Sequence, residues 1–293
     1  MNRHLLLAPL TAATLLFAGA RCESPTATPS APPFTPTPTA TATANPEIGH
    51  KTGAADVVFR YSVEGYLGTY PPYELTYDRV ILYGDGTLLI KQTDFNAAPK
   101  PGDRYTAITL TEAGVQRLLA ATVHEGKLLE QPAQSNAPDQ GVADAGDPHF
   151  VLTVDGGSAD VKANCLGCEE KPADLRERLF KLDQIIAGLD ASWFDAAEVA
   201  SETPYQPDAI LVSAFTGQAP GQSVAWPKDI EQPKPDAGYG SDQALLLCGA
   251  DAATIRKLLD GTESGRVRLK AGTATVRYRP VLPDEQGCSA SAY

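Results

Sequence analysis

The clearest chemical pattern in the sequence is a pair of cysteines in Cys165-Leu166-Gly167-Cys168. A Cys-x-x-Cys pair can exchange electrons when one thiol has a lowered pKa, usually at the N-terminus of a helix. Here the next predicted helix starts at Pro172, and the negative charges of Glu169 and Glu170 would raise a thiol pKa. We therefore expect a structural bridge. A redox pair and a zinc site are the alternatives, although no second Cys or His pair has the spacing that zinc requires.

The remaining cysteines indicate how the chain is cross-linked. Apart from Cys22, the sequence holds Cys165, Cys168, Cys248 and Cys288. In an oxidising compartment, an even set of four forms two disulfides in one of three pairings. We favour Cys165–Cys168 and Cys248–Cys288, because the first two are close in sequence and the second pair would tie the last residues to a strand.

An aspartate-rich loop offers a second possible chemistry. Asp139, Asp144 and Asp147 fall in a long predicted loop, residues 131–148, and carboxylates of this kind could hold Ca²⁺. Their spacing matches no calcium loop, and solvated aspartates are common in turns. We predict no metal and no cofactor.

Nucleophilic catalysis finds little support in the sequence. It lacks Gly-x-Ser-x-Gly, Ser-x-x-Lys and His-Glu-x-x-His, and beyond its first residues only His50, His124 and His149 remain. Carboxylate pairs for glycoside hydrolysis carry no local signature, so an extracellular hydrolase stays an alternative. Because these catalytic motifs are missing, the sequence favours a protein that is not an enzyme.

Aromatic residues in two predicted loops are the candidate binding residues. Tyr66, Tyr70 and Tyr73 surround a Pro-Pro turn, and Trp226 stands in a loop rich in Pro and Gly. Exposed Tyr and Trp offer a large contact area with a polar tip, which suits recognition. The alternative is that these rings pack on the core or fix their own loops.

The N-terminus has the pattern of an export signal. A polar, positive start is followed by an apolar run over residues 5–20, which is too short to span a bilayer. Small residues precede Cys22, whose sulfur is a candidate lipid anchor, although Arg21 departs from the usual lipoprotein cleavage site. We predict a signal peptide over residues 1–21 and a disordered Pro/Thr-rich tether over residues 22–53.

The charge of the chain limits its partners. Its 293 residues carry a formal net charge of −12. Such an acidic chain does not neutralise phosphates, so we expect no nucleic-acid partner, and attachment to a membrane would depend on the N-terminal lipid. The localisation expected is extracytoplasmic, either as a membrane lipoprotein or in secreted form.

The predicted elements give an α+β fold class, with antiparallel sheets and hairpins and helices packed on one face. We divide the chain into an N-terminal half, residues 54–195, and a smaller C-terminal half, residues 205–293. Predicted strands and hairpins cover residues 57–64, 79–91, 150–164, 210–215, 244–248 and 267–279. Predicted helices cover residues 112–125 with Thr111 as N-cap, residues 172–189, and a third capped by Asp251 and ending at Leu259.

Three stretches resemble a family of uncharacterised exported bacterial lipoproteins. They are residues 71–86 (from Pro71-Pro72-Tyr73 to Gly84-Asp85-Gly86), Leu110-Thr111-Glu112-Ala113-Gly114-Val115, and Arg279-Pro280-Val281-Leu282-Pro283-Asp284-Glu285. The resemblance spans most of residues 55–290 and implies a secreted, anchored globular domain. It implies no activity and no site residues.

Together these features favour an exported, membrane-anchored cell-envelope protein that acts as a binding or interaction module for an unknown extracellular partner or ligand. A structural or inhibitory envelope protein without a small-molecule site is the first alternative. The extracellular hydrolase is the second.

Overall fold

The computed structural model describes residues 46–64, 76–92, 100–135, 146–168, 173–216, 221–236, 244–262, 264–285 and 287–288. The predicted signal peptide, Cys22 and most of the predicted tether lie outside these residues. Residues Asn45–Tyr293 group into one compact unit, which is the part described below. No helix in these ranges is long and apolar enough to cross a membrane.

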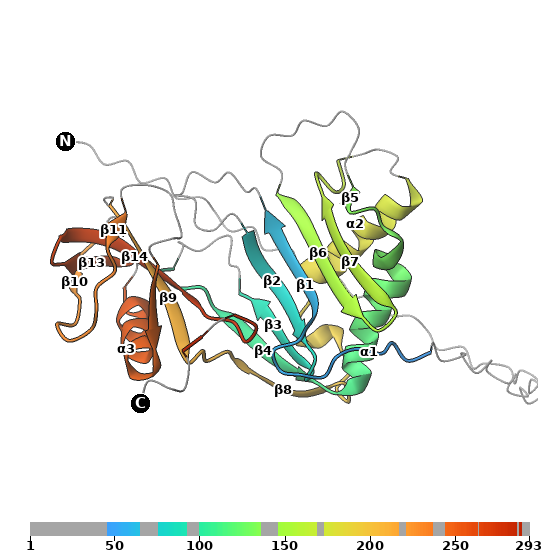
Figure 1. The fold of residues 1–293 in the computed structure, drawn as a ribbon, viewed down its shortest axis with the longest axis horizontal. Coiled ribbons are helices and arrows are strands. Elements are labelled where there is room, and N and C mark those ends of the chain that lie inside the picture. Colours follow the sequence, from blue (N-terminus) through green and yellow to red (C-terminus); the bar gives the residue numbers. More distant parts are fainter. Residues whose placement is uncertain are drawn as a thin grey trace, which may run out of the picture. The chain divides into compact units, whose positions relative to one another are not determined.

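The described strands form two sheets, which confirms the predicted α+β class (Figure 1). The first sheet has the order β5-β7-β6-β1-β2-β3-β4-β8, and only β5 with β7 pairs in parallel. Its strands are β1 Val57–Glu64, β2 Thr76–Tyr83, β3 Thr87–Lys91, β4 Tyr105–Leu110, β5 Gln134–Ser135, β6 Asp147–Val154, β7 Gly157–Ala163 and β8 Val199–Pro204.

The second sheet has the order β10-β13-β14-β9-β11, with β12 also paired to β9. Its antiparallel centre is β13, β14, β9 and β12, while β10 and β11 add short parallel pairs. Its strands are β9 Ala209–Phe215, β10 Val224–Ala225, β11 Pro235–Asp236, β12 Leu245–Cys248, β13 Arg266–Leu269 and β14 Gly272–Pro280.

Within the described ranges, three α-helices accompany the sheets: α1 Glu112–Ala120, α2 Asp174–Ala187 and α3 Gly249–Asp260. Short helical turns add η1 Ala121–Glu125, η2 Leu128–Glu130 and η3 Ala191–Trp193. Figure 1 shows α1 and α2 beside β6 and β7, and α3 beside β9 and β14. Each helix therefore packs its apolar face against one of the two sheets.

The core of the first sheet follows the alternation of its strands. Tyr61 of β1 pairs with Phe150 of β6, and both rings are buried with Leu118 of α1 and Leu182 of α2 in one apolar cluster. Residues of β2, β3 and β4 that point the other way form a separate cluster with Leu282, near the C-terminus. The segment around Leu282 therefore covers part of the opposite face of this sheet.

The core of the second sheet is formed with α3. Ala252, Ile255 and Leu259 of α3 are buried against strand residues such as Val212 and Val276. Their spacing of three and four residues places them on one stripe of the helix. This leaves the opposite stripe of α3 facing away from the second core.

The turns follow from the residues that the sequence places in them. The β2–β3 hairpin closes at Asp85-Gly86, where Gly86 has a φ of +84° and Asp85 Oδ1 accepts a hydrogen bond from the Thr87 amide at 2.9 Å. Gly272, in the β13–β14 hairpin, has a φ of +129°. Glycine adopts such positive φ values because it has no Cβ to clash. The hairpins predicted at Asp85-Gly86 and at Gly272 are therefore confirmed.

The structure corrects several predicted boundaries and roles. Thr111 occupies the N-cap position of α1, but its hydroxyl donates to the Ala197 carbonyl instead of capping the helix. The last turn of that predicted helix, residues 121–125, widens into a π-helical turn. Asp251 is not a cap, since α3 begins at Gly249, whose φ of +52° turns the chain directly out of β12.

Candidate functional site

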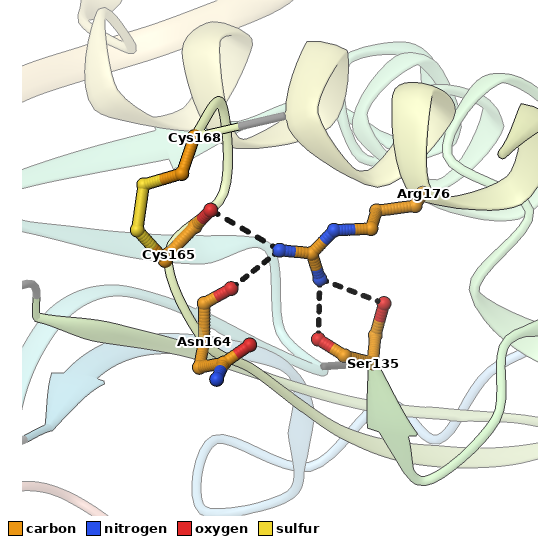
Figure 2. The surroundings of a disulfide bond; sticks show 5 residues. All are labelled: Ser135, Asn164, Cys165, Cys168 and Arg176. Atoms are coloured by element: carbon orange, nitrogen blue, oxygen red, sulfur yellow. Dashed lines mark hydrogen bonds between the residues drawn. A yellow bond between two sulfur atoms is a disulfide. The ribbon is translucent and has the colours of Figure 1, made fainter. Parts of the chain in front are cut away.

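Cys165 and Cys168 are bonded to each other, as predicted, with their Cα atoms 5.5 Å apart. Cys165 is buried and has a φ of +44°, whereas Cys168 is exposed (Figure 2). The helix that follows, α2, begins only at Asp174. The sulfurs therefore lack the helix N-terminus that lowers a thiol pKa in redox pairs, which favours the structural interpretation.

Arg176 of α2 anchors the loop that this disulfide closes. Its guanidinium is buried and donates hydrogen bonds to the carbonyls of Ser135, Asn164 and Cys165, the last two at 2.5 and 3.1 Å (Figure 2). One side chain thus joins α2 to the ends of β5 and β7 and to the disulfide loop. Sequence reasoning missed this role, although Arg176 lies three residues before Leu179, on the buried stripe of the helix.

The second predicted pair, Cys248 and Cys288, is also bonded, with Cα atoms 5.9 Å apart. Cys248 ends β12 and immediately precedes α3. The bridge therefore ties the C-terminal segment to the second sheet, at the start of the helix that packs on it.

The aromatic binding residues predicted from the sequence are not brought together in the described structure. Tyr66, Tyr70 and Tyr73 lie outside the described residues. Trp226 is only 4 % exposed, and its Nε1 donates to the carbonyls of Ile230 and Glu231 at 3.1 Å each. The expectation that Trp226 offers an exposed binding surface is corrected: its ring fixes its own loop against the second core.

The predicted aspartate loop gives no metal site in the part of the chain that the structure describes. Asp147 belongs to β6 and not to a loop, while Asp139 and Asp144 lie outside the described residues. Among the described residues, no three His, Cys, Asp or Glu side chains are grouped as metal ligands. His149 lies 2.7 Å from Asp160, and His50 lies 3.3 Å from Glu112.

A pocket of about 470 Å³ lies where the two sheets meet, and we call it the junction pocket. One wall comes from residues 103–105 at the start of β4, and another from residues 204–207 at the end of β8 and just after it. The stripe of α3 that faces away from the second core supplies Ala253, Arg256, Lys257 and Asp260. Residues far apart in the sequence thus form one concave surface, of the size that small-molecule sites have.

Tyr278 of β14 lines the junction pocket and holds the two sheets together there. Its amide donates to the Pro101 carbonyl at 2.9 Å, and its carbonyl accepts from the Asp103 amide at 3.1 Å. The ring lies directly against the backbone of Gly102, where any Cβ would overlap it. A side chain at this position would therefore have to displace the Tyr278 ring.

Charged side chains in the junction pocket are partly paired with one another. Asp260 accepts a hydrogen bond from the Tyr278 hydroxyl at 2.8 Å and forms an ion pair with Arg104 at 3.1 Å. Burial, and then the bond to Asp260, raise the pKa of Tyr278 well above its usual range, so the phenol stays a neutral donor. Asp103 is paired with Lys91 at 2.9 Å.

Two cations of α3 are left for other partners. Arg256 makes one long hydrogen bond, from Nη1 to the Pro207 carbonyl at 3.5 Å. Lys257 is exposed and forms no hydrogen bond or ion pair within the described residues. The pocket therefore joins tyrosine and proline surfaces with two cations whose charge is not balanced by a neighbour.

Sequence reasoning did not find the junction pocket. The residues of α3 at spacings of three, four and seven were visible as a polar helix face, but polar faces are usually only solvated. Arg104 and Tyr278 come from other elements, and no local motif connects them to this helix. Comparison with protein-family models, with curated proteins and with solved structures found no match to the chain.

Proposed function

We propose that the chain is an exported cell-envelope protein, held at the membrane by a lipid on Cys22, that binds a small polar molecule in the junction pocket. The observation that carries this proposal is the pocket itself, which combines aromatic and proline walls with convergent charged groups. Ligand sites in proteins have this mixture, in which apolar walls give contact area and a few polar groups fix orientation.

The export part of the proposal is supported by the two disulfides and by the N-terminal pattern. Disulfides persist in oxidising compartments and are rare in reducing ones. An acidic surface with a net charge of −12 favours solubility outside the cell and disfavours nucleic acid. Mass spectrometry of the mature N-terminus tests this part: a diacylated Cys22 is expected, and cleavage after Ala20 would show a released protein.

The binding part is tested by a thermal-shift screen of the mature protein. The panel holds hexoses, hexuronates, dicarboxylates, amino acids, dipeptides and phosphate esters. A ligand at 100 times its Kd stabilises the folded state by about 2.7 kcal/mol, which raises the Tm of a domain of this size by roughly 5 °C or more. We expect such a shift for at least one chemical class.

A pocket-filling variant shows whether that shift comes from the junction pocket. Ala253 is exposed on the wall that α3 contributes, so Ala253→Trp should fill the pocket without disturbing the core. Ala250→Trp, on an exposed position of the same helix, is the matched control. If no compound shifts the Tm, or if Ala253→Trp responds like the wild type, the binding proposal is wrong and a structural role in the envelope gains support.

A further inference from the structure

We propose that the ligand of the junction pocket is a small organic anion whose carboxylate is held by Arg256 and Lys257. This inference rests on the proposed function, since it names the chemical class that the same pocket would take. Three observations support it: where Arg256 and Lys257 lie, which charged groups of the pocket are already paired, and the net charge around the two cations.

The position of the two cations is fixed by the helix that bears them. Ile255 and Leu259 bury one stripe of α3 in the second core, so Arg256 and Lys257 lie on the stripe that lines the pocket. Ala253, one turn earlier on this stripe, has a short side chain and leaves room beside them. A ligand in the pocket would therefore meet both cations together.

The pairing of the charges leaves these two cations as the available donors. Arg104 is engaged by Asp260, and Asp103 by Lys91. Arg256 has one hydrogen bond of 3.5 Å to a neutral carbonyl, and Lys257 has no partner among the described residues. An arginine presents a planar fork that matches both oxygens of a carboxylate, and a neighbouring lysine adds a point charge.

The local charge favours an anion although the whole chain is acidic. The end of α3 contributes about half a negative charge through its free carbonyls, which is less than the two unbalanced positive charges beside it. The chain as a whole, with a net charge of −12, repels extended polyanions. A volume of about 470 Å³ fits a small molecule. The two local positive charges, the acidic chain around them and the limited volume together favour a compact anion over a charged polymer.

The test compares anions with neutral molecules of the same shape. Glucuronate is paired with glucose, and succinate with succinamide, and each is titrated into ¹⁵N-labelled mature protein by NMR. We expect at least one carboxylate to shift the amide signals of the pocket, such as those of Tyr205 and Gln206, and its neutral counterpart to bind at least tenfold more weakly. The affinity should fall as salt is added.

Charge-matched variants test the residues. Arg256→Gln with Lys257→Gln should weaken carboxylate binding about tenfold or more, since charge-assisted hydrogen bonds are lost. Arg178→Gln with Lys181→Gln removes the same charge from exposed positions on α2 and should leave the affinity unchanged.

Two results would overturn the inference in distinguishable ways. If glucose or succinamide binds in the pocket as tightly as its acid, or if both double variants lose the same affinity, the anion assignment is wrong while a binding pocket stands. If none of the four compounds shifts a pocket signal and the thermal-shift panel also gives no ligand, the proposed function is wrong as well.

Discussion

The hydroxyl of Tyr83 on β2 donates a hydrogen bond of 2.7 Å to Asp284, which lies 201 residues later in the chain. The same carboxylate forms an ion pair of 2.5 Å with Arg60 of β1. Tyr83 is fully buried, and Asp284 has a side chain only 18 % exposed. The C-terminal segment is thereby fixed to the first sheet by contacts of high sequence separation.

Removing this carboxylate should therefore destabilise the whole unit. Asp284→Ala leaves the Arg60 charge and the Tyr83 hydroxyl without their partner, and we expect the free energy of unfolding to fall by about 2–3 kcal/mol. Urea unfolding measures the loss. Glu130→Ala, which breaks the exposed pair with Lys127, is the control and should change stability by less than about 0.5 kcal/mol. Equal effects of the two variants would contradict the assigned role.

A side chain at Gly102 should destabilise the fold and disturb the junction pocket. In Gly102→Ala the added Cβ would overlap the Tyr278 ring, whose hydroxyl is held by Asp260, so we expect a loss of about 1–3 kcal/mol together with weaker ligand binding in the junction pocket. Gly156→Ala is the control, since nothing lies within 4 Å of a Cβ at that turn. Thermal unfolding and the binding titration are both measured. A Gly102→Ala protein as stable as the wild type would show that Tyr278 moves freely.

Arg176 should matter more than its neighbour Arg178. Arg176→Met removes the donor shared by the carbonyls of Ser135, Asn164 and Cys165, and we expect the free energy of unfolding to fall by about 2–4 kcal/mol. Arg178→Met breaks only an exposed pair with Asp174 and should be close to neutral. Hydrogen exchange of the β7 amides would show whether local opening accounts for the loss.

The two disulfides should differ in their contribution to stability. Replacing Cys248 and Cys288 by serine opens a loop with a sequence separation of 40 residues and should cost about 3–4 kcal/mol. Replacing Cys165 and Cys168 opens a loop with a separation of only 3, for which about 2 kcal/mol is expected. Denaturant unfolding of both variants measures the difference. A larger loss from the shorter loop would indicate that Arg176 depends on the Cys165–Cys168 bond.

The pH dependence of stability should report on Asp183 of α2. Burial raises the pKa of this carboxyl, against the opposing effects of the Tyr61 hydroxyl, which donates to it at 2.5 Å, and of Arg79. The folded state therefore binds the proton more tightly than the unfolded state, whose pKa is about 3.9. Protonated Asp183 therefore stabilises the folded state at pH values below the unfolded pKa. This contribution is lost as the pH rises through the higher pKa that Asp183 has in the folded state.

Asp183→Asn cannot titrate at this position, so the difference between the wild type and this variant isolates the contribution of Asp183. Relative to Asp183→Asn, the wild type should lose stability as the pH is raised from 4 toward 7. Urea unfolding of both proteins at several pH values gives the difference in the free energy of unfolding. A difference that does not change with pH, or that favours the wild type at higher pH, would contradict the raised pKa.

Much of the fold could be predicted from local signals. The Asp85-Gly86 turn, the apolar stripe of α2 and the alternation in β6 each follow from neighbouring residues, and the structure confirms them. Strand β4 and strand β8 were not predicted, because their residues are only partly apolar and are defined by pairing across the sheet. Trp226 shows the same limit, since its burial depends on how its loop packs.

By itself, the sequence determined the acidic balance of the chain and predicted the α+β class, and it favoured the pairing of Cys165 with Cys168 and of Cys248 with Cys288 that the structure shows. These features follow from composition, periodicity and short separations along the chain. Only the tertiary structure decided that Arg104, Tyr278 and the outer stripe of α3 line one pocket, and that Arg176 is buried. The physical reason is that both depend on contacts between distant segments, which local patterns do not encode.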